Sequence, residues 1–107
     1  SLKLTKLPKL VNLPEGLQHV TTLQSLRVKS CGNFKALPQW LYSLSSLQSL
    51  ELLRCSELKS LPEVLRRMNS LTELVIYCCN DELSDRCREP DGEDCPKIRH
   101  ISQLHIT

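Results

Sequence analysis

The stretch LPQWLYSLSSLQSLELLRCSELKS, residues 37–60, decides how this chain folds. The blocks before and after it, residues 13–36 and 61–84, have the same length of 24 residues and share the frame LPxxLxxLxxLxxLxLxxCxxL, with small changes in the third copy. A repeated unit of this size predicts stacked structural repeats around one continuous core. Residues 1–12 match the second half of a further copy, so we expect the chain to begin inside a repeat.

The spacing of leucines within a block predicts its local structure. In the LxxLxL part the last two leucines lie two residues apart, and both therefore point to one face of a short strand. In the LPxxLxxL part the proline fixes φ near a helical value at a first turn, and leucines three residues apart keep one side of the segment against the interior. The predicted fold is one domain of class α/β, a solenoid with a parallel β-sheet on the concave side and short helical or 3-10 segments on the convex side.

The six cysteines divide into two groups. Cys31, Cys55 and Cys79 recur every 24 residues just after the strand, where a small buried side chain is expected beneath the turn. This period favours reduced structural thiols over a disulfide framework, although a disulfide or metal ladder along the stack remains an alternative. The other three cysteines lie at positions 78, 87 and 95.

The period fails once, between residues 84 and 95. Moving 24 residues past Leu74 reaches Ile98, whereas moving 30 reaches Leu104 and restores LxxLxL as ISQLHI. Residues 85–107 are therefore predicted to form a terminal capping repeat with six extra residues, an irregular loop from about 84 to 94, and a last strand near 103–106. Cys95 then takes the place of a core leucine and Cys87 belongs to the loop, so we expect Cys87 to react faster with thiol reagents.

Composition and charge exclude several classes of function. No apolar run approaches the length of about 18 residues that a membrane span needs, and the first ten residues contain no continuous apolar stretch for a signal peptide. The net charge of +2 does not predict nucleic-acid binding. We therefore expect a soluble cytoplasmic protein without a nucleic-acid or membrane partner. Basic residues dominate residues 1–30 and acidic residues dominate residues 81–94.

Two chemical alternatives have weak support in the sequence. A zinc site could draw on Cys78, Cys79, Cys87, Cys95, His100 and His105, but the C-x7-C-x7-C spacing differs from the close pairs that structural zinc prefers. No cysteine or serine stands in a recognisable catalytic frame, and none of the three glycines belongs to a GxxxxGK phosphate loop. The sequence therefore predicts neither an enzyme nor a cofactor.

The candidate binding residues are those that alternate with the buried strand positions and line the concave sheet. Leu53, Val75 and Tyr77 are apolar outside the core and lie next to charges, a mixture that suits protein recognition. The full predicted set is Lys3, Arg27, Lys29, Glu51, Leu53, Glu73, Val75, Tyr77, Gln103 and His105. The uncapped edge of SLKLT at the start of the chain is a second possible contact, through which the protein could self-associate.

These features together resemble the C-terminal leucine-rich-repeat region of plant intracellular immune receptors, the nucleotide-binding leucine-rich-repeat disease-resistance proteins of the coiled-coil class. The resemblance covers the whole chain and rests on repeats such as SCGNFKALP and RCSELKSLP and on the ending RCREPDGEDCPKIRHISQLHIT. In that family Cys95 is usually tryptophan, so we expect a cap with a smaller anchor.

The resemblance implies a function in recognition. It implies that the chain senses a pathogen effector or a guarded host protein, and that it helps to hold the receptor's own nucleotide-binding module inactive. A substrate-recognition or scaffold module outside immunity, built on the same fold, is the alternative.

Overall fold

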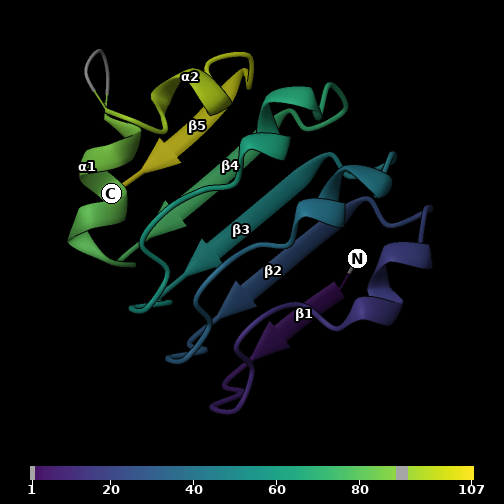
Figure 1. Cartoon of the computed structure of the whole chain (residues 1–107), viewed down its shortest axis with the longest axis horizontal. Helices are drawn as coiled ribbons and strands as arrows, with labels where there is room; N and C mark the ends of the chain where they lie inside the picture. Colours follow the sequence, from purple (N-terminus) through teal and green to yellow (C-terminus); the bar gives the residue numbers. More distant parts are fainter. Residues whose placement is uncertain (1, 89–91) are drawn as a thin grey trace.

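The computed structural model describes residues 2–88 and 92–107 and contains one parallel sheet (Figure 1). Within these residues five strands follow one another across the sheet in chain order. They are β1 (Leu2–Thr5), β2 (Ser25–Lys29), β3 (Ser49–Leu53), β4 (Glu73–Tyr77) and β5 (Gln103–Ile106). The leucine-rich-repeat solenoid predicted from the sequence is thus confirmed.

The register of the strands follows the sequence repeat. Leu26 pairs with Leu50 and Leu50 with Leu74, each 24 residues further along the chain. Leu74 then pairs with Leu104, which confirms the longer offset of 30 and the last strand. Equivalent leucines therefore stack from coil to coil along the whole sheet.

Short 3-10 helices form the convex side, as the proline positions indicate. They are η1 (Glu15–His19), η2 (Gln39–Ser43) and η3 (Glu63–Arg67). Each proline lies one residue before its helix, with an extended ψ, rather than inside the first turn as expected. It still begins the helix, because the carbonyl oxygen of Pro38, for example, accepts the first hydrogen bond from the Leu41 N–H at 3.2 Å.

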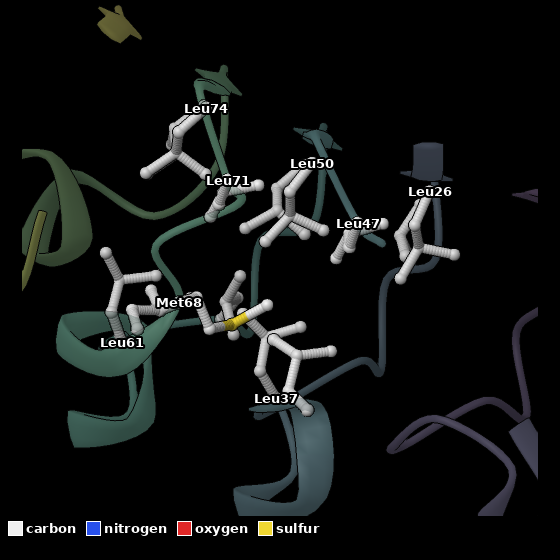
Figure 2. Close-up of a cluster of buried hydrophobic side chains, with 14 of the residues drawn as sticks. Leu26, Leu37, Leu47, Leu50, Leu61, Met68, Leu71 and Leu74 are labelled. Atoms are coloured by element: carbon white, nitrogen blue, oxygen red, sulfur yellow. The ribbon is translucent and has the colours of Figure 1, made fainter. Parts of the chain in front are cut away.

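Between the sheet and the 3-10 helices lies a core made largely of leucine. Figure 2 shows strand residues such as Leu26, Leu50 and Leu74 on one side of this core and Leu37 and Leu61 on the other. Leu50 has no exposed surface at all. Burying one such side chain contributes about 1.5–3 kcal/mol, and no coil can achieve this burial without its neighbours.

A left-handed residue follows each of the first four strands. Lys6, Ser30, Arg54 and Cys78 have φ between 52° and 56°. For a residue other than glycine this conformation costs about 1 kcal/mol. A backbone hydrogen bond stabilises this conformation, because the N–H of each left-handed residue donates to a carbonyl oxygen at the end of the next coil. The Arg54 N–H, for example, donates to the Tyr77 carbonyl oxygen at 2.8 Å. The turn thus adds one more hydrogen bond between neighbouring coils.

The repeated cysteines lie beneath these turns, as predicted. Cys31 and Cys55 are fully buried, and Cys79 is half-buried. Each thiol donates to a backbone carbonyl oxygen of the preceding coil. Cys31 Sγ lies 3.7 Å from the Leu4 oxygen, and Cys79 Sγ lies 3.3 Å from the Leu52 oxygen. All six cysteines are free thiols in this structure.

The predicted irregular loop at about 84–94 is wrong in its first part, because residues 84–87 belong to a helix. Residues Asp81–Cys87 form helix α1, Cys95–Ile98 form the short helix α2, and residues 89–91 of the predicted loop lie outside the described part. Helix α1 has a sequence basis, because the Asn80 side chain caps it by accepting from the Glu82 N–H at 2.8 Å. Leu83 and Cys87, four residues apart, then face the core together.

The placement of Cys87 is therefore also corrected. It lies in α1 and is only 3% exposed, instead of belonging to an open loop. Cys95 is 1% exposed, in agreement with its prediction as a core position. The expected faster reaction of Cys87 loses its structural basis, because burial raises the pKa of this thiol to about 12.

A buried carboxylate fastens the terminal coil to the third repeat. Asp94 is completely buried and accepts from Arg86 at 3.0 and 3.1 Å, from the Lys97 ammonium at 2.7 Å and from the Leu61 N–H at 2.9 Å. Lys97 also donates to the Leu61 carbonyl oxygen at 2.8 Å. Burial raises the pKa of Asp94, but the hydrogen bonds from Arg86, Lys97 and Leu61 outweigh burial and hold this pKa below its usual value.

Between α1 and α2 the backbone approaches itself closely at Gly92. A Cβ atom there would overlap the carbonyl oxygens of Arg86 and Arg88. The Gly92 N–H donates to the Arg88 oxygen at 2.8 Å, and the Asp94 N–H donates to the Arg86 oxygen at 2.7 Å. Only glycine fits this crossing, which brings Asp94 to its three partners.

We predict that Asp94→Asn lowers the free energy of unfolding by about 3 kcal/mol, because it leaves Arg86 and Lys97 without their shared partner. Urea unfolding at pH 7 measures this loss. Because the pKa of Asp94 is lowered in the folded state, its contribution is complete above about pH 4 and is lost as the pH falls further. The stability difference between the two proteins should therefore shrink below pH 4.

Asp85→Asn is the matched control for this experiment. Asp85 pairs with Arg88 at 3.1 Å, but about 70% of each side chain is exposed, at 69% and 71%. An exposed pair contributes at most about 1 kcal/mol. Equal losses for Asp85→Asn and Asp94→Asn would contradict a special role for the buried carboxylate.

We further predict that Cys79 is alkylated before Cys87 and Cys95. Cys79 is half-buried, whereas Cys87 and Cys95 are buried, and burial also raises the pKa of Cys87 to about 12. Iodoacetamide labelling followed by peptide mass spectrometry gives the order, and Cys78→Ser removes the exposed neighbouring thiol. Labelling of Cys87 at the rate of Cys79 in the folded protein would show that α1 does not protect it.

Candidate functional site: the concave sheet

The outward side chains of the strands form one continuous face, as the strand pattern predicts. In each strand, exposed or half-buried residues alternate with more buried ones. The register places Lys3 beside Arg27, Arg27 beside Glu51, Glu51 beside Val75 and Val75 beside His105. All ten residues predicted to bind a partner lie on this face: Lys3, Arg27, Lys29, Glu51, Leu53, Glu73, Val75, Tyr77, Gln103 and His105.

Two predicted binding residues in the middle of the face form an ion pair. Arg27 Nε lies 2.6 Å from Glu51 Oε2, and their side chains are 36% and 26% exposed. The hydrogen bond to Glu51, together with its charge, raises the pKa of Arg27. A ligand that binds either side chain must therefore compete with, or bridge, this existing pair.

A second contact engages the other carboxylate of the sheet. Ser49 Oγ donates to Glu73 Oε1 at 3.0 Å, across the neighbouring strands β3 and β4. Glu51 and Glu73 are the acidic side chains among the ten predicted residues, and both already have a partner within the sheet. The carboxylates of this face are therefore less available than its cations.

Cations gather at the carboxyl ends of the strands. Lys29 ends β2, and the left-handed residues Lys6 and Arg54 follow β1 and β3. All three are exposed, and none forms an ion pair with any residue in the described part of the chain. Lys6 and Arg54 were not in the predicted set, because strand alternation says nothing about the residue just beyond a strand.

Apolar side chains lie next to these cations. Leu53 pairs with Lys29 on one side and with Tyr77 on the other. Leu53 and Val75 are half-buried, and Tyr77 is 44% exposed. The face therefore combines exposed charge with apolar area outside the core, the mixture typical of a protein-binding surface.

Two hollows lie away from this face. One of about 310 Å³ is bordered by Cys87, Leu104 and Ile106 at the end of the sheet, and one of about 320 Å³ by Leu37, Leu61 and Lys97 on the convex side. In residues 2–88 and 92–107 no three His, Cys, Asp or Glu side chains lie close enough to hold a metal ion. Within the same residues no helix is long and apolar enough to cross a membrane.

Comparison with solved structures identifies a similar fold. The chain resembles the leucine-rich repeat domain of the type III effector XCV3220 (XopL), with a TM-score of 0.63 and 28% identity. The likeness covers 76% of this chain but 26% of that one, so the chain spans about a quarter of the length of that domain. No curated protein matches the sequence.

Comparison with family models gives the assignment. Residues 5–79 match the family described as R13L1/DRL21 LRRs, which is 75 of the 107 residues. The match begins at Thr5, the last residue of β1, includes β2 to β4 and ends at Cys79, before α1, so it does not include the terminal cap. The chain belongs to the R13L1/DRL21 family of leucine-rich repeats, a fold that serves as a scaffold for protein-protein interaction.

Proposed function

We propose that this chain is the protein-recognition part of a plant intracellular immune receptor, a nucleotide-binding leucine-rich-repeat disease-resistance protein of the coiled-coil class that acts in the cytoplasm. The observation that carries the proposal is the concave face, which presents Arg27 and Glu51 in one row across the strands and Tyr77 in the next row, all outside the core. The family match supports the repeat type, and the ending GEDCPKI resembles the last coil of such receptors.

In this proposal the concave face has two binding partners in turn. In the resting receptor it contacts the nucleotide-binding module and contributes to autoinhibition. During infection it binds a pathogen effector or a guarded host protein. One surface can serve both partners, because an ion pair such as Arg27 with Glu51 is partly exposed to solvent and costs little to rearrange.

The alternative is a substrate-recognition or scaffold module outside immunity. The similar solved structure favours it, because that domain belongs to a bacterial effector rather than to a receptor. Both functions use the face for binding alone, so neither requires catalysis or a cofactor. They differ in whether a nucleotide-binding module of the same protein is a partner.

We predict that a pull-down with the nucleotide-binding module of the same receptor captures this chain, and that Arg27→Glu or Glu51→Arg abolishes most of the capture. The melting temperature should remain nearly unchanged, since the ion pair is partly exposed to solvent and contributes little to stability. Circular dichroism measures the melting temperature of each variant. Failure of the wild-type chain to bind the module would favour the alternative function.

The exchange variant Arg27→Glu/Glu51→Arg separates recognition from stability. It restores an ion pair between the two strands but inverts the charge at both positions. If the residues serve recognition, the exchange variant stays as deficient in capture as the single variants. Recovery of capture by the exchange variant would show instead that the pair acts by holding β2 against β3.

A further inference from the structure

We infer that the carboxyl-end rim of the concave sheet binds an acidic segment of a partner protein in which a large apolar side chain lies beside the carboxylates. The rim consists of Lys6, Lys29, Leu53, Arg54 and Tyr77. This inference rests on the proposed recognition function and names the chemistry of the partner, which that function leaves open.

The first step is the placement of the rim residues. Lys29, Leu53 and Tyr77 are direct neighbours on three adjacent strands. The Lys6 N–H donates to the Lys29 carbonyl oxygen at 2.9 Å, and the Arg54 N–H donates to the Tyr77 carbonyl oxygen at 2.8 Å. With about 4.8 Å between strands, the five residues occupy a strip along one edge that a short extended segment can follow. Figure 1 shows this edge at the arrowheads of β1 to β4.

The second step is that the fold does not require cations at this edge. The same left-handed position is occupied by Lys6, Ser30, Arg54 and Cys78 in successive coils, with nearly the same φ. The solenoid therefore accepts a small neutral side chain there as readily as a long basic one. The basic side chains of Lys6 and Arg54 add nothing that the turn needs, and their charge is available for a ligand.

The third step is the balance of charge on the face. The cation of Arg27 is already paired with Glu51. The carboxylate of Glu73 accepts from Ser49. The cations of the rim have no ion-pair partner among the described residues, so three positive charges at the ends of adjacent strands lack compensation. Carboxylates from a partner relieve their mutual repulsion.

The fourth step is the apolar part of the rim. Tyr77 is 44% exposed, and Leu53 beside it is half-buried although it points away from the core. A partner that covers these two side chains removes apolar surface from water. The hydroxyl group of Tyr77 can still form a hydrogen bond at the border of the contact. An acidic segment with an aliphatic or aromatic anchor matches both kinds of side chain.

A protein segment fits this surface better than a nucleic acid. Tyr77 is the one Phe, Tyr or Trp side chain among the described strands, whereas single-stranded nucleic acids use several stacking partners. Glu51 and Glu73 lie on the same sheet and repel a phosphate backbone that crosses it. A peptide whose carboxylates contact the rim alone avoids Glu51 and Glu73.

The test is a fluorescence anisotropy titration with three labelled nine-residue peptides and a nine-residue oligothymidylate. The first peptide has Asp and Glu around a central leucine, the second replaces the acids by Asn and Gln, and the third replaces the leucine by serine. At 50 mM salt we expect the first peptide to bind at least tenfold more tightly than the second and several-fold more tightly than the third. Tighter binding of the oligothymidylate than of the first peptide overturns the inference.

Substitutions locate the binding to the rim. Lys29→Glu/Arg54→Glu should weaken binding of the first peptide about tenfold or more, and Tyr77→Ser several-fold. Lys35→Glu/Lys59→Glu makes the same change in net charge at exposed positions outside the strands, and should change binding less than twofold. Equal effects of the two double variants overturn the inference, because attraction would then depend on net charge alone.

One further variant and the pull-down keep the result interpretable. Arg54→Ser introduces the residue that the preceding coil carries as Ser30, so it should fold normally and still weaken peptide binding. The proposed function and this inference fail separately in the pull-down with the nucleotide-binding module. If Arg27→Glu abolishes capture and Lys29→Glu/Arg54→Glu leaves it unchanged, the inference about the rim is overturned. The proposed function then still stands.

Discussion

The structure depends on one constraint, the stacking of each leucine on its equivalent in the next coil. Leu50 has no exposed surface because Leu26 and Leu74 cover it from both sides. No coil contains enough apolar area to fold alone, so the free energy of the whole array resides in the contacts between coils. The hydrogen bonds from left-handed residues such as Arg54 extend this contact by one residue past each strand.

The same constraint explains why the fold could be predicted from the sequence. Each coil meets the same neighbours, so the same residue types recur at a fixed spacing, and even the last strand could be located from ISQLHI. The terminal coil breaks this uniformity. The change of offset from 24 to 30 residues predicts a loop there, although the Asn80 cap and the pair Leu83 and Cys87, four residues apart, indicate a helix.

Other features depend on topology and could not be predicted from a pattern. The Asp94 carboxylate and the Leu61 N–H are 33 residues apart in the sequence, and only the crossing of the chain at Gly92 brings them together. The basic rim was missed for a related reason. Alternation along a strand assigns its residues to two faces, but it does not place Arg54, which follows β3 in a left-handed conformation.

The two clusters of charge in this chain differ in what surrounds them, and this difference determines their roles. Asp94 is completely buried with Arg86 and Lys97, so salt screens it little and its contribution to stability persists at high ionic strength. The exposed cations Lys29 and Arg54 lie in water, where attraction to a ligand weakens as the ionic strength rises. Salt therefore changes binding at the concave face without loosening the terminal coil, and the fold can hold the recognition surface constant while the affinity varies.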